Sequence, residues 1–158
     1  MTAIHGKLVP ELGVSDWTAS VRFYRDVLGF RVRYERPEEG FAYLALGVAE
    51  IMIDQLDRGR TFDDGHRPAA HPFGRGVNLQ IEVDGIAPLV TSLARAGWPL
   101  YLDVEERWYR RDDVEVGNRQ FAVADPDGYL LRFFENMGER SPRDQTAGDP
   151  ANTEGLPK

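Results

Sequence analysis

An internal repeat limits the possible folds of this chain more than any single motif does. The segments DWTASVRFYRDVLGF (residues 16–30) and DGIAPLVTSLARAGW (residues 84–98) both begin with Asp and end with Gly and an aromatic residue at identical spacing. In each segment the Asp is a typical helix N-cap, and the Gly is typical of the position just past the last helical turn. Apolar residues recur at helical spacing, which predicts one buried face on each helix. The chain therefore contains two related helices.

The segments around the two helices repeat as well. Residues 8–14 and 77–83 alternate in polarity and predict a strand before each helix. Each helix is followed by one predicted strand and then a predicted hairpin, at 31–35 and 41–55 in the first copy and at 99–103 and 119–135 in the second. We predict an α+β fold of two tandem βαβββ modules, which form a curved mixed sheet around a cleft and carry their helices on the outer face.

Two polar stretches lie outside the predicted modules. Residues 57–75 are rich in Gly, Pro and charged residues, and loops of this length are often functional or mobile. Residues 138–158 have almost no large apolar side chains, which is typical of disorder. We therefore predict a single domain over residues 1–137, divided into a first module (7–56), a linker (57–75) and a second module (76–137), with a disordered tail at 138–158.

Composition excludes several classes of function. The chain has no cysteine, so disulfides, thiolate metal ligands and a cysteine nucleophile are excluded. Its formal net charge of −7 disfavours nucleic acid and favours cationic partners. No apolar run approaches the ~20 residues of a membrane helix, and the first ten residues lack the apolar core of a secretion signal. We expect a cytoplasmic protein that binds neither nucleic acid nor membranes.

Strand alternation predicts which side chains face the cleft. In the strand at 77–83 the apolar row should meet the helix, which leaves Asn78, Gln80 and Glu82 on the concave face. The same reasoning places further side chains there, namely Glu11, Met52, Asp54, Arg132 and Phe134. Arg132 interrupts an otherwise apolar strand, and an unpaired buried guanidinium is costly. We therefore expect its partners among the carboxylates of Glu11, Asp54 and Glu82.

Aromatic residues near the predicted rim would turn this polar face into a small-molecule pocket. They are Phe41, Tyr43, Trp98, Trp108, Tyr109 and Phe121. An antiparallel sheet with one solvated face would present the same polar row without any ligand. The duplication and the aromatic rim favour a pocket over this alternative.

The repeat and four motifs resemble the vicinal oxygen chelate superfamily, which contains glyoxalases, bleomycin-resistance proteins and dioxygenases. The motifs are VSDWTASVRFYRDVLGF, GVAEIMIDQ, LQIEVD and FAVADPDGYLLRFFEN. Enzymes of this superfamily usually bind a divalent metal through two His and one Glu, and the resemblance places Val9, Asn78 and Arg132 at these positions. Val has no ligand atom, Asn is a weak ligand, and Arg would repel a cation. The resemblance therefore implies neither a metal nor another cofactor.

The metal-free bleomycin-resistance branch resembles the chain most, through VPELGVSD and DPDGYLLRFFEN. Its members are homodimers that sequester the drug in crevices lined by aromatic and acidic groups. The resemblance implies a homodimer that binds a small aromatic or cationic antibiotic-like molecule without catalytic residues. Where this branch often has a Trp, eight or nine residues before Asp-Pro, this chain has Val116 and Gly117. That departure favours a flat or aromatic antibiotic other than bleomycin.

The alternative is an enzyme of the same fold. It would be a metal-dependent lyase, isomerase or dioxygenase with unconventional ligands, or a metal-free catalyst with Glu11 or Glu82 as its base. His66 and His71 lie in the linker. We expect them to be solvated loop residues rather than metal ligands.

Overall fold

The computed structural model describes residues 6, 8–59 and 65–143, which contain two four-stranded sheets. The first sheet has the order β1-β4-β3-β2, with β1 at Glu11–Val14, β2 at Arg31–Arg36, β3 at Phe41–Leu46 and β4 at Ala49–Gln55. The second has the order β5-β8-β7-β6, with β5 at Asn78–Glu82, β6 at Leu102–Arg111, β7 at Val114–Ala124 and β8 at Leu130–Arg140. The shared order confirms the predicted duplication and the α+β class.

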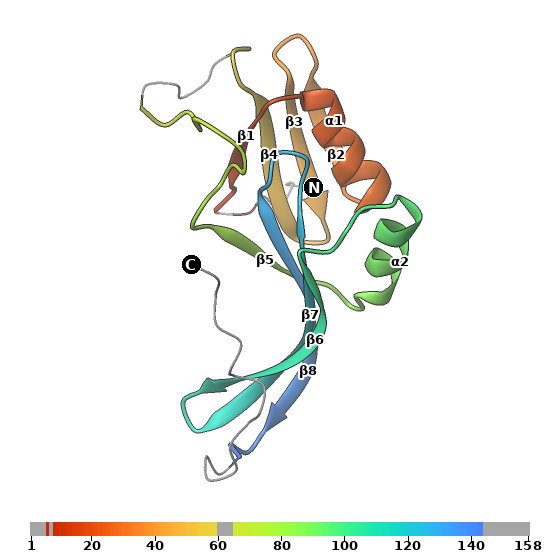
Figure 1. Ribbon diagram of the computed structural model, residues 1–158, viewed down its shortest axis with the longest axis vertical. Helices are drawn as coiled ribbons and strands as arrows, with labels where there is room; N and C mark the ends of the chain where they lie inside the picture. The colour runs from red at the N-terminus through yellow and green to blue at the C-terminus, as the bar shows by residue number, and fades with distance from the viewer. Residues whose placement is uncertain (1–5, 7, 60–64, 144–158) are drawn as a thin grey trace, which may run out of the picture.

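Both sheets are mixed in the same way, because β1 pairs parallel with β4 and β5 pairs parallel with β8. The other neighbouring strands are antiparallel. Helices α1 (Trp17–Arg22) and α2 (Ala87–Arg95) lie on the same side of the molecule (Figure 1). A π-helical turn, η1 (Phe23–Val27), extends α1. Each sheet thus has one face toward a helix and one face that no described helix covers.

The apolar side chains predicted to point inward form one core shared by both modules. Ile51 and Ile53 of β4 are buried together with Ile81 of β5 and with Leu131 and Phe133 of β8. Their alternating neighbours on the same strands face the opposite side of each sheet. The predicted division of the strands into two faces is therefore confirmed.

The two helices begin differently, although their sequences suggest the same cap. Asp16 caps α1 as predicted, because its Oδ1 accepts a hydrogen bond of 3.1 Å from the Ala19 N–H. The predicted Asp84 cap is wrong. Helix α2 begins at Ala87, and the N–H of its N-cap residue Ile86 donates to Glu135 Oε2 at 2.8 Å. A carboxylate from β8, distant in the sequence, thus replaces the local cap.

The β6–β7 hairpin and the end of β8 extend beyond the predicted strands and project away from the rest of the molecule (Figure 1). The Trp108 ring lies against Gly117, where an added Cβ would be 2.7 Å from it. The Arg140 guanidinium stacks on Trp108 and pairs with Glu115 at 2.6 Å. The predicted tail therefore begins too early, because residues 138–140 belong to β8. Its remaining part from 144 onward lies outside the described residues.

The turn between β7 and β8 connects the two modules and the linker. The Asp125 carboxylate accepts a hydrogen bond of 2.8 Å from the Tyr24 hydroxyl, and Asp127 accepts bonds of 2.9 and 2.5 Å from the Ser15 N–H and hydroxyl. The His71 ring lies 2.7 Å from Asp127 Oδ1. The His71 side chain is exposed, as expected for a solvated loop residue, and it is also held by a carboxylate.

Candidate functional site

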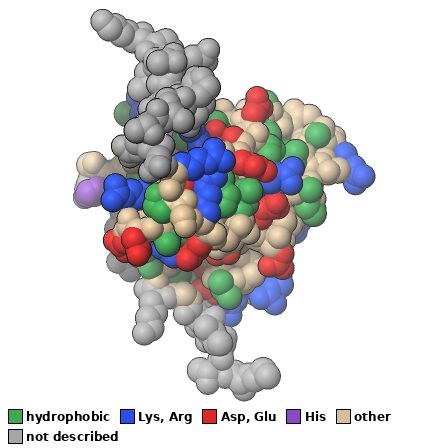
Figure 2. Space-filling model, turned by 90° about the horizontal axis from the view of Figure 1, so that it is seen from below, with side chains coloured by type: hydrophobic (Ala, Val, Ile, Leu, Met, Phe, Trp, Pro, Cys, Tyr) green, Lys and Arg blue, Asp and Glu red, His purple; other side chains and the backbone are tan. Residues whose placement is uncertain are grey.

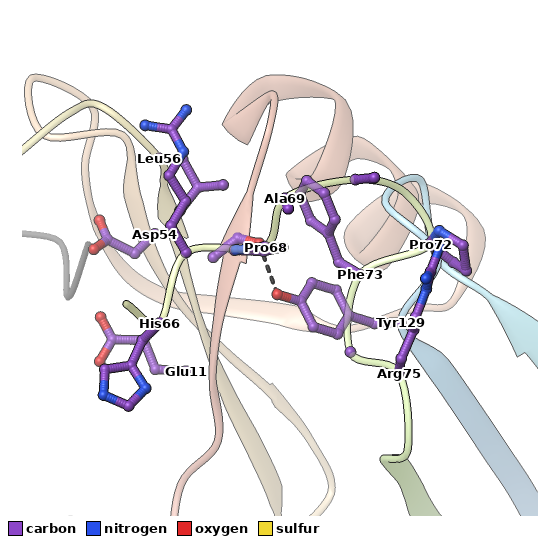
Figure 3. Close-up of a pocket in the computed structure, with 14 residues that line it drawn as sticks. Glu11, Asp54, Leu56, His66, Pro68, Ala69, Pro72, Phe73, Arg75 and Tyr129 are labelled. Carbon is purple, nitrogen blue, oxygen red and sulfur yellow. Dashed lines mark hydrogen bonds between the residues drawn. The ribbon is translucent and has the colours of Figure 1, made fainter. Parts of the chain in front are cut away.

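The part of the linker that the structure describes forms a wall of a pocket, which we call the linker pocket, with a volume of about 560 Å³. Figure 3 shows Glu11, Asp54 and His66 on one side of it and Phe73, Arg75 and Tyr129 on the other. The Tyr129 hydroxyl donates to the carbonyl of Gly13 at 2.8 Å. Burial, followed by the charges of Asp125 and Asp127, raises the pKa of Tyr129 to about 12, so it stays a neutral donor.

A second hollow, the first-sheet pocket, lies on the uncovered face of the first sheet, is lined by residues of β1, β2, β3 and β4, and has a volume of about 300 Å³. It shares Glu11 and Asp54 with the linker pocket, and its other lining residues are Tyr34, Arg36, Glu39, Phe41 and Met52. The Tyr34 ring stacks on Phe41 and on Tyr43, with centroids 6.0 and 5.1 Å apart. Flat aromatic rings beside two carboxylates suit an aromatic or cationic guest.

Glu50 holds the aromatic part of this sheet in place. Its carboxylate accepts bonds from the Tyr43 hydroxyl at 2.8 Å and from the Gly6 N–H at 2.6 Å, and it pairs with Arg33. The hydrogen bonds from Gly6 and Tyr43 hold the pKa of Glu50 below its usual value. Glu50 therefore stays charged and orients Tyr43 beneath Tyr34.

The uncovered face of the second sheet carries a separate hollow of about 360 Å³, the second-sheet pocket. It is lined by Gln80, Tyr109, Arg111, Val116, Asn118, Arg132, Phe134, Asn136 and Glu139. Arg132 lies there as predicted, but its partners are not carboxylates. It donates to Gln80 Oε1 at 2.5 Å and to the Tyr109 hydroxyl at 3.5 Å. The expectation that Glu11, Asp54 or Glu82 pairs with Arg132 is therefore wrong.

The structure separates predicted site residues that the sequence suggested would share one cleft. The first-sheet pocket contains Glu11, Phe41, Met52 and Asp54, whereas the second-sheet pocket contains Gln80, Tyr109, Arg132 and Phe134. The two pockets share no lining residue. Asn78 and Glu82 are exposed on β5, outside the lining of either pocket, and Tyr43 is buried under Tyr34.

Three predicted rim aromatics lie elsewhere. Phe121 is completely buried and stacks on Phe133 in the core. Trp98 packs on the helix side, where its Nε1 donates to the Ala124 carbonyl at 2.8 Å and its ring lies 4.6 Å from that of Phe23. Trp108 points to the face opposite its neighbour Tyr109, because successive strand residues alternate. For these three residues the predicted position at the rim of the cleft is wrong.

Other lining residues were missed by sequence reasoning. Alternation along RVRYER puts Tyr34 and Arg36 on one face, so that segment contained a usable signal. Arg111 and Glu139 were missed because their strands run further than the apolar pattern suggests. The linker residues around Phe73 have no periodic pattern, and only the tertiary structure brings them to the pocket.

Comparison with known proteins identifies the family. The profile of the Glyoxalase/Bleomycin resistance protein/Dioxygenase superfamily matches residues 8–133. The chain belongs to this superfamily. A bleomycin resistance protein of Geobacillus stearothermophilus is 31% identical over 135 residues, which cover 82% of this chain and 96% of the relative. A lactoylglutathione lyase of Haemophilus influenzae is 30% identical over 139 residues, which cover 82% of this chain and 92% of the relative.

Solved structures support the same fold for this superfamily member. TioX from Micromonospora sp. ML1 superposes with a TM-score of 0.64 at 21% identity, over 85% of this chain and 100% of that one. At this identity the likeness concerns the fold alone. Across the described residues, no helix has the length and apolar character needed to cross a bilayer.

The residues at the superfamily's usual metal positions do not fit a metal. Val9 offers no donor atom, Asn78 offers one amide oxygen, and Arg132 brings a guanidinium that already binds Gln80 and Tyr109. Within residues 6, 8–59 and 65–143, no three potential ligands of the His, Cys, Asp or Glu type gather at one place. These three side chains therefore do not form a metal site.

Proposed function

We propose that this superfamily member binds a small aromatic or cationic antibiotic-like molecule and protects its host by sequestering it. The observation that carries the proposal is the first-sheet pocket, where the half-exposed Tyr34 ring stands beside the exposed carboxylate of Glu11. Stacking on aromatic rings and attraction to carboxylates together suit a flat, cationic compound. The bleomycin resistance relative, matched over nearly its whole length, supports the same class of ligand.

We also propose that the binding protein is a cytoplasmic homodimer. The two pockets lie on sheet faces that no described helix covers, and the distal ends of β6, β7 and β8 project from the molecule (Figure 1). A second copy would cover these faces and close the pockets. Sedimentation should show a dimer at micromolar concentration, and a monomer under those conditions would contradict this arrangement.

A thermal-shift screen tests the binding proposal. The panel should contain bleomycin-type glycopeptides, enediynes, mitomycin-like compounds and other aromatic antibiotics. A ligand at a hundredfold excess over its Kd adds about 2.7 kcal/mol to the free energy of unfolding, which gives a readily measured shift. A screen without hits would contradict the proposal.

Two matched variants locate the binding site. Glu11→Gln removes an exposed carboxylate that lines both the first-sheet pocket and the linker pocket, and Glu106→Gln removes an exposed carboxylate from β6 outside all of the pockets described above. A cationic hit should lose much of its shift with Glu11→Gln and keep it with Glu106→Gln. Equal losses would mean that the ligand responds only to net charge.

The lactoylglutathione lyase relative favours an enzyme as the second candidate. Such an enzyme would use either a metal with ligands other than those at the usual positions or an exposed carboxylate such as Glu82 as a base. Metal analysis of purified protein, together with assays on dicarbonyl thiol adducts and catechols, separates the two candidates. Stoichiometric, tightly bound metal or turnover would favour the enzyme.

A further inference from the structure

The guanidinium of Arg132 in the second-sheet pocket has polar neighbours but no counter-charge among the described residues. Its two hydrogen-bond partners, Gln80 Oε1 and the Tyr109 hydroxyl, are both neutral. Its Nε is buried and has no hydrogen-bond partner within the described part of the chain. A buried donor without a partner is costly, and a permanent positive charge cannot be relieved by deprotonation. The buried Nε is out of reach of a ligand, so an external acceptor would bind the terminal Nη groups, which carry the same uncompensated charge at the pocket.

The carboxylates near this pocket already have other partners. Glu139 of β8 pairs with Arg111 of β6, and both residues line the pocket. Glu105 accepts a hydrogen bond of 2.9 Å from Gln120 Nε2 and lies 3.4 Å from the Arg107 guanidinium. These contacts leave the charge of Arg132 without a local carboxylate.

Tyr109 adds a second donor to the same spot. Its hydroxyl oxygen accepts from Gln120 Nε2 at 2.7 Å and from Arg132 Nη1 at 3.5 Å. Because both neighbours donate, the hydroxyl proton of Tyr109 is left to donate elsewhere. The pocket thus offers the Tyr109 O–H and the free N–H groups of Arg132 to one acceptor.

Apolar surface adjoins these donors. Phe134 and Val116 line the same pocket, and Tyr109 is 38% exposed. Donors from a guanidinium fork next to aromatic surface match a planar ring that carries an oxyanion.

We propose that the second-sheet pocket binds the carboxylate or another oxyanion of an aromatic ligand, with Arg132 and Tyr109 as the donors. This inference rests on the proposed small-molecule binding function and adds an anionic group to the ligand. The first-sheet pocket, with Glu11 and Asp54, would receive a different part of the ligand or a different ligand.

Titrations followed by NMR chemical shifts test the proposal on the full chain. The probes are benzoate and phenyl phosphate, which distinguish a carboxylate from a phosphate, and benzamide as the neutral analogue of benzoate. The wild-type protein should bind at least one anionic probe more tightly than benzamide, with shifts at Gln80 and Phe134. Binding should weaken as salt is added.

Three variants of the two donor residues and one control variant assign the donors. Arg132→Met should weaken binding of the anionic probe about ten- to a hundredfold, as expected for loss of charge-assisted hydrogen bonds. Tyr109→Phe should weaken it less, because the guanidinium remains. Arg119→Met is the matched control, since Arg119 is an exposed arginine on the opposite face of β7, and it should bind as the wild type does. Arg132→Lys, which keeps the charge but loses the fork, should give an intermediate affinity if Arg132→Met fails to fold.

The proposal is overturned if no anionic probe binds, if benzamide binds as tightly as both anionic probes, or if the Arg132 variants keep wild-type affinity. Hits from the antibiotic screen that bind Arg132→Met normally would retain the proposed function and reject this anion site. If the screen gives no hits but benzoate binds in a way that depends on Arg132, the anion site is retained and the proposed antibiotic-binding function is rejected.

Discussion

Replacing Tyr24 by Phe removes the hydrogen bond between the modules, and the cost of this change should depend on pH. Tyr24 is completely buried, and its hydroxyl donates to Asp125 at 2.8 Å. Burial, followed by the Asp125 charge, raises the pKa of Tyr24, so the hydroxyl keeps its proton. Asp125 also accepts from the N–H groups of Asp127 and Tyr129 at 2.9 Å each.

The pKa of Asp125 sets the direction of the effect. Burial raises it from 3.8 to about 6, although the hydrogen bond from Tyr24 lowers it. Between pH 4 and 6 the folded protein holds a proton that the unfolded chain has released, so this group makes the free energy of unfolding fall as pH rises. The pKa of Asp125 differs by about two units between the folded and unfolded states. This difference corresponds to roughly 3 kcal/mol in the free energy of unfolding, and the protein has lost this contribution once the pH is above 6.

Tyr24→Phe should therefore cost more at pH 8 than at pH 5. At pH 8 the lost bond is made to a charged carboxylate and contributes about 1.5–3 kcal/mol, whereas at pH 5 the acceptor is protonated and the bond contributes about 0.5–1.5 kcal/mol. Urea unfolding followed by circular dichroism at both pH values measures the two costs.

Asp125→Asn supplies the control, because an amide keeps the shape and an acceptor oxygen but does not titrate. In that background Tyr24→Phe should cost the same at pH 5 and pH 8. An equal cost at both pH values in the wild-type background, or a larger one at pH 5, would refute the role of a charged Asp125.

Three further predictions concern the turn and the distal hairpin. Gly117→Ala places a Cβ 2.7 Å from the Trp108 ring, so the indole N–H resonance of Trp108 should shift while binding in the first-sheet pocket is unchanged. Asp127→Ala removes the acceptor of three hydrogen bonds and should lower the free energy of unfolding by about 2–3 kcal/mol in urea titrations; a loss under about 0.5 kcal/mol would contradict the assignment. A chain ending at Met137 should melt at a lower temperature than a chain ending at Arg143, because only the former lacks the last ion pairs of β8; equal melting temperatures would contradict this.

The sequence predicted those features that local patterns determine. Alternation in EIMIDQ and YLLRFFE correctly separated Ile53 and Phe133 in the core from Met52 and Arg132 on the uncovered face. The repeat of Asp, apolar face and Gly located both helices. In these cases neighbouring residues on one element decide the outcome.

Contacts between distant segments account for most of the errors. Asp84 is not a cap because Glu135 occupies the N–H of Ile86. Arg132 has no carboxylate partner because Glu11 and Asp54 belong to a different sheet with its own pocket. Neither the contact of Glu135 with Ile86 nor the separation of Arg132 from Glu11 and Asp54 can be predicted from a local pattern, because each depends on strand register and on how the sheets pack.

The turn between β7 and β8 has a counterpart in the first module, and the two have diverged. Gly47 and Val48 form the equivalent turn between β3 and β4, where Val48 is 97% exposed. In the second module Asp125 and Asp127 are instead buried against the first module. The two halves have therefore ceased to be interchangeable. A protein built from two copies of the first half would keep every strand and helix but lose the contacts that let both halves melt together, and it should unfold in separate steps.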